Sequence, residues 1–205
     1  MHPIIGIDFD NTIINYDAVL LRLAVERGLV PPTARPSKKS IRDHIRTLPD
    51  GDIQWQQLQA ILYGPAIAEA ALTDGVADFI RGCRRRGWPV SVVSHKTVYS
   101  NLGGSRVSFH EAAGRWMCDH GFFDADGLGF RQTDVFYEPT RKQKVARIAA
   151  LGCTHFIDDL EETFLERTFP AGVAKILYNP HNEPVAMGGV QVCTDWDQIG
   201  TRIFS

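Results

Sequence analysis

The amino-acid sequence predicts an α/β fold, with a doubly wound, mainly parallel, Rossmann-like sheet and a small all-helical insertion. Short apolar runs rich in β-branched residues alternate with helical patterns along most of the chain, which is typical of βαβ units. The runs are continuously apolar, as expected of strands that helices cover on both faces. Between the first two runs, residues 15–72 carry helical patterns only, so we expect the insertion there.

Length and composition indicate a globular protein of about one domain. The chain has 205 residues, 44% of them hydrophobic, and 22 Lys and Arg against 24 Asp and Glu give a net charge of −2. Such a chain lacks the strongly basic surface typical of nucleic-acid binding. No apolar run approaches the roughly 18 residues that span a bilayer, and residues 1–10 lack a signal-peptide pattern. We therefore expect a cytoplasmic monomer or homodimer with no nucleic-acid or membrane partner.

The predicted sheet has five strands. The first, at residues 4–10, is a β-branched run that ends in carboxylates, and residues 89–94 form a second run of the same character. Three further strands are expected towards the C-terminus, the last of them from the weakest pattern: residues 154–157, 173–178 and 190–193. Continuous apolar composition favours burial of these strands in a parallel sheet.

Helices are expected between these strands. A glycine follows the helical patterns at residues 77–86 and 141–151 and ends each helix. Another helix is expected at residues 109–122. Together the strands and helices define a predicted core domain made of residues 1–14 and 73–205.

The insertion at residues 15–72 is expected to contain three helices. The first two are predicted at residues 17–27 and 40–48. Asp52 is predicted to cap the third, whose apolar stripe includes Trp55. This segment is predicted to form a small helical cap over the carboxyl ends of the strands.

Polar side chains stand at four strand ends or helix starts. Ligands of open α/β sheets bind outside the carboxyl ends of the strands, so we expect these side chains to gather there. They are Asp8 and Asp10 after the first strand, Ser94 at the end of the second, a lysine at the start of the 141–151 helix, and Asp158 and Asp159 after the third strand.

These residues resemble the four motifs of the haloacid dehalogenase (HAD) superfamily, in the order that the family has them. The resemblance covers about residues 4–178. Most members of the family are Mg²⁺-dependent phosphohydrolases, and a C1-type cap is inserted between their first two motifs, where this chain has its helical insertion. The motifs are Asp8-x-Asp10-x-Thr12, Ser94 after an apolar strand, Lys144, and Ile157-Asp158-Asp159.

The resemblance implies different roles for the first two aspartates. Asp8 would be the nucleophile and a metal ligand, and would form an aspartyl-phosphate. Asp10 would bind the metal through its backbone carbonyl, protonate the leaving oxygen and then deprotonate the attacking water. Dehalogenases of the family lack this second aspartate and its P-type ATPases carry threonine there, so Asp10 favours phosphate-ester hydrolysis.

The other motifs imply a metal site and a phosphate site. By resemblance, Asp159 would bind Mg²⁺ directly and Asp158 through a metal-bound water. Ser94 and Lys144 would hold the transferring phosphoryl oxygens. Lys142 also lies at the helix start, but Lys144 fits the family pattern better and is favoured.

Several nearby residues permit two interpretations. His95 and Lys96 follow Ser94 and either contact substrate or form a surface loop; we include His95 among the substrate-binding candidates. Trp55 is expected to pack rather than to touch substrate, and Thr12 to stabilise its turn. Simple exposure is expected for the basic residues of the cap that could otherwise meet a second anionic group: Arg35, Lys38, Lys39 and Arg42.

The sequence thus predicts a Mg²⁺-dependent phosphatase acting on a small phosphorylated metabolite, with the cap limiting substrate size. Two alternatives stay open at this point. A phosphotransferase or phosphomutase would use the same motifs, and a non-catalytic phosphoryl-binding regulatory module would keep them without turnover.

Overall fold

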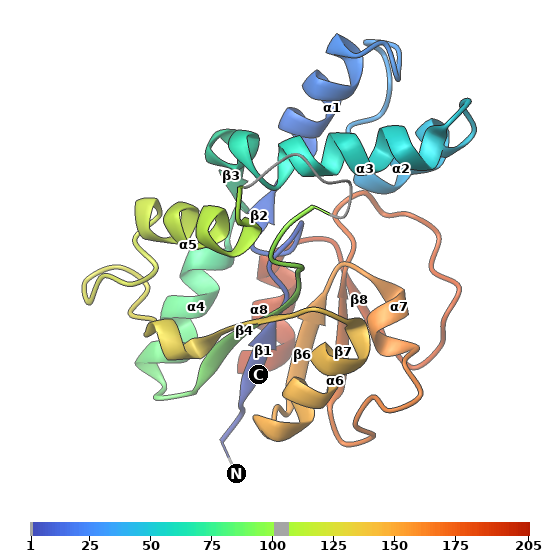
Figure 1. Ribbon diagram of the computed structural model, residues 1–205. Coiled ribbons are helices and arrows are strands. Elements are labelled where there is room, and N and C mark those ends of the chain that lie inside the picture. The colour runs from blue at the N-terminus through green and yellow to red at the C-terminus, as the bar shows by residue number, and fades with distance from the viewer. Residues whose placement is uncertain (1, 101–106) are drawn as a thin grey trace.

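A six-stranded sheet forms the centre of the computed structural model, which describes residues 2–100 and 107–205 (Figure 1). Its strand order is β5–β4–β1–β6–β7–β8, and each neighbouring pair is parallel. The chain runs outward from β1 in both directions, so the predicted α/β Rossmann-like sheet is confirmed. The strands are Ile5–Ile7 (β1), Val90–His95 (β4), Val135–Glu138 (β5), His155–Asp158 (β6), Ala174–Tyr178 (β7) and Gln191–Cys193 (β8).

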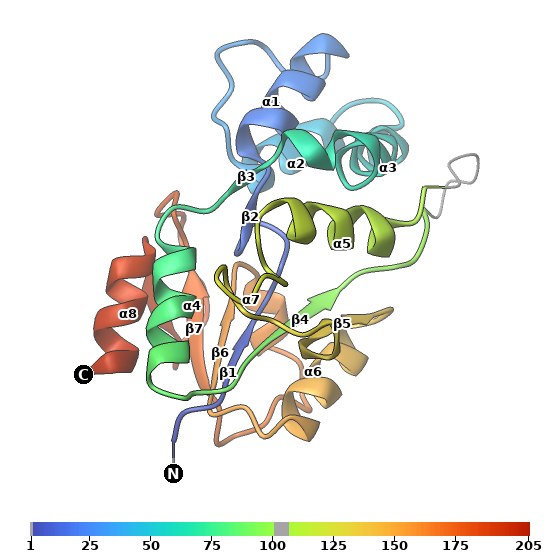
Figure 2. The same ribbon diagram turned by 90° about the vertical axis from the view of Figure 1, so that its left-hand side faces the viewer.

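Helices cover both faces of the sheet (Figure 2). On one face α4 and α8 pack together, and the rings of Phe79 and Phe204 stack with their centroids 5.2 Å apart. On the other face, Ile148 of α6 and Phe164 of α7 share an apolar cluster with Phe156 of β6. The helices that flank the core are Val76–Arg85 (α4), Phe109–Asp119 (α5), Arg141–Ala150 (α6), Glu161–Phe164 (α7) and Trp196–Phe204 (α8).

The helices of the insertion lie together beyond the carboxyl ends of the strands (Figures 1 and 2). Their apolar sides bury residues such as Leu20, Ile45 and Leu58, which belong to the same apolar cluster as residues of the sheet. The helices are Asp17–Glu26 (α1), Lys38–Arg46 (α2) and Gly51–Leu62 (α3), followed by the 3₁₀ turn Pro65–Glu69. No helix in the described part of the chain has the length and apolarity of a membrane span.

The prediction of an all-helical insertion is wrong at its two ends. Ile14–Asn15 (β2) and Ala71–Leu72 (β3) form a two-stranded antiparallel ribbon where the chain enters and leaves the insertion. Strands of two residues are too short to produce an alternating pattern, so residues 15, 71 and 72 gave no strand signal.

The structure differs from the predictions at two further places. Asp52 does not cap α3: Asp50 occupies the N-cap position with a φ of 53°, and Asp52 lies in the first turn, paired with Arg46 at 3.0 Å. The strand β5 was not predicted: its apolar run is only three residues long (135–137), and all four of its residues are half-buried at the edge of the sheet. Edge position, rather than strand propensity, explains the omission.

Candidate active site

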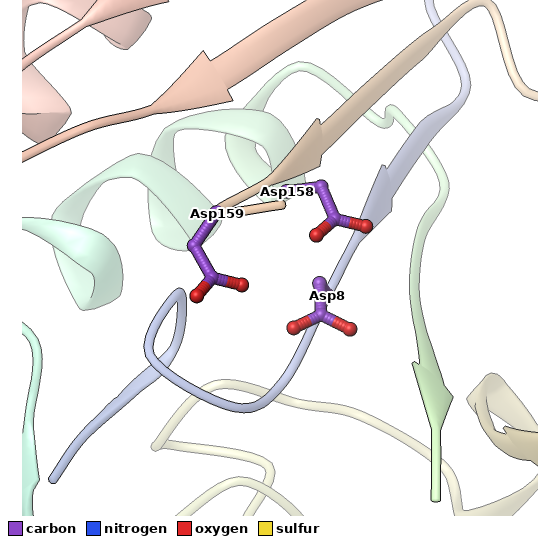
Figure 3. A group of neighbouring side chains, drawn as sticks. All are labelled: Asp8, Asp158 and Asp159. Carbon is purple, nitrogen blue, oxygen red and sulfur yellow. The ribbon is translucent and has the colours of Figure 1, made fainter. Parts of the chain in front are cut away.

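Three carboxylates converge at the carboxyl ends of β1 and β6 (Figure 3). One oxygen from each of Asp8, Asp158 and Asp159 lies within 4.8 Å of the others. The register of the sheet brings the three carboxylates together, because β1 and β6 pair in parallel. The Asp8 backbone N–H donates to the Ile157 carbonyl at 2.9 Å. Residues 150 positions apart in the sequence therefore form one acidic cluster.

The cluster has the donor set and the electrostatics of a site for a hard divalent cation. Burial, with the neighbouring carboxylates, raises the pKa of Asp8 to about 8, although Lys144 opposes the shift. Burial likewise raises the pKa of Asp159 to about 7, against the effect of Lys38. Asp159 Oδ1 is buried and has no hydrogen-bond partner in the described part of the chain. Crowded carboxylates and a free oxygen fit a divalent cation that prefers oxygen ligands.

Lys144 lies against this cluster. The Thr140 side chain accepts a hydrogen bond from the Gln143 backbone and begins α6, which places Lys144 one turn into the helix. Its buried ammonium donates to Asp8 Oδ1 at 2.5 Å and to Asp158 Oδ2 at 2.6 Å. Burial lowers the pKa of Lys144, but its two acidic partners outweigh that effect and raise it. The structure thus brings Lys144 to the carboxylates, whereas Lys142 is exposed.

Asp10 has different surroundings from the three clustered carboxylates. The Lys96 ammonium lies 2.9 Å from Asp10 Oδ1 and 2.8 Å from Oδ2, and the Tyr16 hydroxyl donates to Oδ1 at 2.9 Å. Lys96 is 4% exposed, so the surface-loop interpretation of Lys96 is wrong. Its position just after a buried strand and Ser94 was the only sequence signal for this role.

A cavity of about 440 Å³ opens beside these residues. Asp8, Asp10 and Lys144 line it, together with Ser94 and His95. The Ser94 hydroxyl is buried and has no hydrogen-bond partner among residues 2–100 and 107–205, so it is available to a ligand. His95 is only partly exposed to solvent. Its partial burial and nearby Lys144 lower its pKa, which favours a neutral imidazole.

Residues of the cap form the opposite wall of the cavity. The prediction of exposure is wrong for Lys38, whose side chain is 17% exposed and whose ammonium lies 3.9 Å from Asp159 Oδ2. The helix α2 begins two residues earlier than predicted, with Ser37 as its cap, and this start places Lys38 over the acidic cluster. Arg42 also lines the cavity, while Trp55 lines it and is packed in the apolar core as predicted.

The remaining candidates are Arg35, Lys39 and Thr12. Arg35 and Lys39 are exposed, as expected; Arg35 donates to the His181 carbonyl and Lys39 lies 3.7 Å from Glu183. Thr12 is fully buried, but its hydroxyl makes no hydrogen bond within the described residues, so the expected turn contact is not seen.

Comparison with known proteins places this geometry in a recognised fold. No protein-family model and no curated protein matches the sequence. Among solved structures, a family IA, variant 3 HAD hydrolase from Entamoeba histolytica matches with a TM-score of 0.61 and 12% identity, over 98% of this chain and 96% of its own. The putative HAD-hydrolase YfnB from Bacillus subtilis, bound to magnesium, matches with a TM-score of 0.56 and 15% identity, over 98% of both chains.

The chain has the haloacid dehalogenase fold. An L-2-haloacid dehalogenase also matches, with a TM-score of 0.56 and 13% identity over 100% of this chain and 99% of its own. Because the HAD fold serves more than one kind of reaction, the activity has to be argued from the side chains at the site.

Proposed function

We propose that the chain is a Mg²⁺-dependent phosphatase that hydrolyses a small phosphate monoester through an aspartyl-phosphate on Asp8. One observation carries the proposal: Asp8 and Asp159 of the acidic cluster line the same cavity as a separately held further aspartate, Asp10. Ester hydrolysis requires these groups: a nucleophile beside a cation site and a general acid/base nearby.

The chain offers oxygen ligands for one Mg²⁺ ion. Asp8 and Asp159 would bind it directly, Asp158 through a water, and Asp10 through its backbone carbonyl. When bound, Mg²⁺ would supply the positive charge that allows an anionic carboxylate to approach an anionic phosphate. The magnesium described for YfnB, which shares the fold, agrees with this choice of metal.

In the first step, Asp8 attacks phosphorus and the ester P–O bond breaks. Asp10 gives its proton to the leaving oxygen as that bond breaks. Water then attacks the phosphorus of the aspartyl-phosphate, returning a proton to Asp10 and freeing Asp8. Lys144 orients Asp8 through its 2.5 Å contact, and the free Ser94 hydroxyl donates to a phosphoryl oxygen.

The leaving group distinguishes ester hydrolysis from dehalogenation. A halide departs as a stable anion and needs no proton, whereas an alkoxide needs one. Asp10 lines the cavity two residues after the nucleophile, where an acid is useful only for the alkoxide. The side chains therefore favour a phosphate ester over a haloacid.

The cavity favours a small metabolite as substrate. Its volume of about 440 Å³ falls within the range of small-molecule sites. Lys38 and Arg42 from α2 and Trp55 from α3 form part of its wall, so the cap would select the alcohol part of the ester.

A panel of phosphorylated metabolites, assayed with Mg²⁺ and with EDTA, tests the proposal. We expect phosphate release that requires Mg²⁺, is absent in Asp8→Asn, and favours one class of ester by about 100-fold or more. Phosphate release that is equal in the wild type and Asp8→Asn, or no release from any ester, would refute the proposal.

A further inference from the structure

Lys96 is a buried charged residue to which the reaction steps above give no role. It directly follows β4, and its side chain is 2% exposed. We propose that Lys96, together with Tyr16, is a positioning residue that holds the Asp10 carboxyl group in the orientation needed for proton transfer. This inference rests on the proposed function and extends it to residues outside the four motifs.

The backbone of Lys96 is anchored on both sides. Its N–H donates to the Glu138 carbonyl of β5 at 2.9 Å, and its carbonyl lies 2.9 Å from His110 Nε2 of α5. The ammonium lies 4.6 Å from the centroid of the Tyr63 ring and 5.7 Å from that of Phe9. Aromatic faces attract a cation, so the side chain is confined laterally as well.

The two oxygens of the Asp10 carboxyl group have different numbers of donors. Oδ1 accepts from both Lys96 and Tyr16, whereas Oδ2 has Lys96 alone. Tyr16 is fully buried, and its hydroxyl donates to Asp10 Oδ1 at 2.9 Å. Each carboxylate oxygen has two lone pairs, and Oδ2 therefore retains the one that can carry the transferred proton.

The proton that Asp10 gives to the leaving oxygen is replaced by one from the attacking water. The O–H bond at Asp10 Oδ2 breaks as the leaving oxygen gains its proton, and it forms again when water attacks the aspartyl-phosphate. Lys96 donates throughout and is not itself consumed. Lys96 also follows Ser94 by two residues, so one strand end positions both the phosphate donor and the acid.

The same logic applies to the nucleophile. Lys144 contacts Asp8, and Lys96 contacts Asp10, so each reacting aspartate has its own buried lysine. If Lys96 only stabilised the fold, its loss would lower the amount of folded protein and leave the dependence of the rate on the leaving group unchanged. The inference therefore predicts a defect in proton transfer rather than a general loss of folded protein.

The test uses two substrates with the same ring but different leaving groups, phenyl phosphate and p-nitrophenyl phosphate. Phenoxide is the poorer leaving group and depends more on an acid. The measured quantity is the ratio of kcat/KM for p-nitrophenyl phosphate to kcat/KM for phenyl phosphate, with Mg²⁺ present. Because both values come from one preparation, the ratio does not depend on the fraction of protein that is folded.

We expect Lys96→Met to raise this ratio by about 10-fold or more, towards that of Asp10→Asn. Tyr16→Phe removes one donor and should raise it less, and Lys96→Arg, which keeps the charge, should restore part of the wild-type value. Lys142→Met is the matched control and should leave the ratio unchanged, since Lys142 is exposed.

A ratio for Lys96→Met equal to that of the wild type would overturn the inference while leaving the proposed function intact. If Asp10→Asn also leaves the ratio unchanged, Asp10 is not the acid, and the role of Lys96 is refuted with it. If the wild type hydrolyses neither compound nor any ester of the metabolite panel, the proposed function itself fails, and the inference fails with it.

Discussion

The buried lysines of this site illustrate how strongly single side chains depend on their partners. Lys144 lies between Asp8 and Asp158 with none of the three open to solvent by more than 7% of its side chain. Removing one member of such a group leaves uncompensated charge in a medium of low dielectric, which is more costly than losing a surface ion pair. The consequences can be measured on activity and on stability.

Replacing Lys144 and Lys142 separately tests which lysine serves the proposed phosphate site. We expect Lys144→Met to lower kcat/KM by about 100-fold or more, because the growing phosphoryl charge loses a donor and Asp8 loses its orientation. Lys142→Met should match the wild type. Equal losses in the two variants, measured with p-nitrophenyl phosphate and Mg²⁺, would contradict the assignment.

The raised pKa of Asp159 predicts a pH dependence of stability in EDTA. Its carboxyl group titrates at about 7 in the folded chain, against an ordinary value of 3.8. Between these values the folded chain holds a proton that the unfolded chain has released, so the free energy of unfolding falls as pH rises across this window. Asp159→Asn lacks this group and should show a shallower fall.

Thermal unfolding of both proteins at several pH values from about 4 to about 8 checks this sign. His95 and His155 have lowered pKa values, so they make the free energy of unfolding rise with pH. Both proteins contain these groups, so their contributions cancel when the variant is compared with the wild type. Parallel curves for the wild type and Asp159→Asn would show that Asp159 does not hold its proton in this range.

Motif spacing could predict the acidic residues but not all of their partners. Asp8, Asp158 and Asp159 lie at the ends of strands that are evident from their apolar runs, and parallel pairing brings such strand ends together. Lys96 contacts Asp10 only through the packing of β4 against β1, and Lys38 reaches Asp159 from the insertion. Pairings of this kind depend on tertiary geometry, to which local patterns are insensitive.

At the scale of elements, two features of the sequence predicted strands and helices correctly: continuous apolar runs, and glycines that follow helical patterns. They predicted the five strands that the structure contains in the interior and on one edge of the sheet, and the helices α4 and α6. The missed strands have physical reasons for it: β5 is a short, half-buried edge strand, and β2 and β3 have two residues each. The helix α8 was missed although the Asp195 side chain caps it.

Two glycines provide a test of how closely these elements pack. A Cβ atom at Gly6 of β1 would lie 2.6 Å from Phe156 Cδ2 and 3.0 Å from Cys153 Sγ, while nothing lies within 4 Å of one at Gly114 of α5. We expect Gly6→Ala to lower the free energy of unfolding by about 1–3 kcal/mol through overpacking. Gly114→Ala should raise it by about 0.5–1 kcal/mol, because alanine favours the helix.

Urea unfolding of the two variants measures both effects against the wild type. A Gly6→Ala protein as stable as the wild type would show that β1 and β6 have room between them. That result would argue against the claim that close packing of β1 on β6 fixes the position of Asp8, which follows β1 directly.

At the scale of the whole molecule, the doubly wound sheet brings together segments that are far apart in the chain. Asp8 follows the first strand, Lys144 comes from α6, and Asp159 follows β6, with the helices of the insertion above them. A cation held by such a cluster would join these segments only in the folded chain. Ligands that bind only the folded state stabilise it by mass action.

We therefore expect Mg²⁺ to raise the thermal unfolding midpoint of the wild type. At a concentration about 100 times the Kd, the stabilisation should be about 2.7 kcal/mol. Asp159→Asn should show little of this increase, because the cluster loses a carboxylate ligand. A Mg²⁺-induced rise of the same size in both proteins would place the ion elsewhere.

Trapping the phosphoryl group on the Asp10→Asn variant tests the central claim most directly. With p-nitrophenyl phosphate and Mg²⁺, the first step needs little help from an acid, whereas hydrolysis of the intermediate lacks its base. The time course should show a stoichiometric burst of nitrophenol. Acid quenching followed by peptide mass spectrometry should find a phosphoryl group on Asp8. A phosphoryl group on another residue, or none on Asp8 while the wild type turns over, would contradict the mechanism.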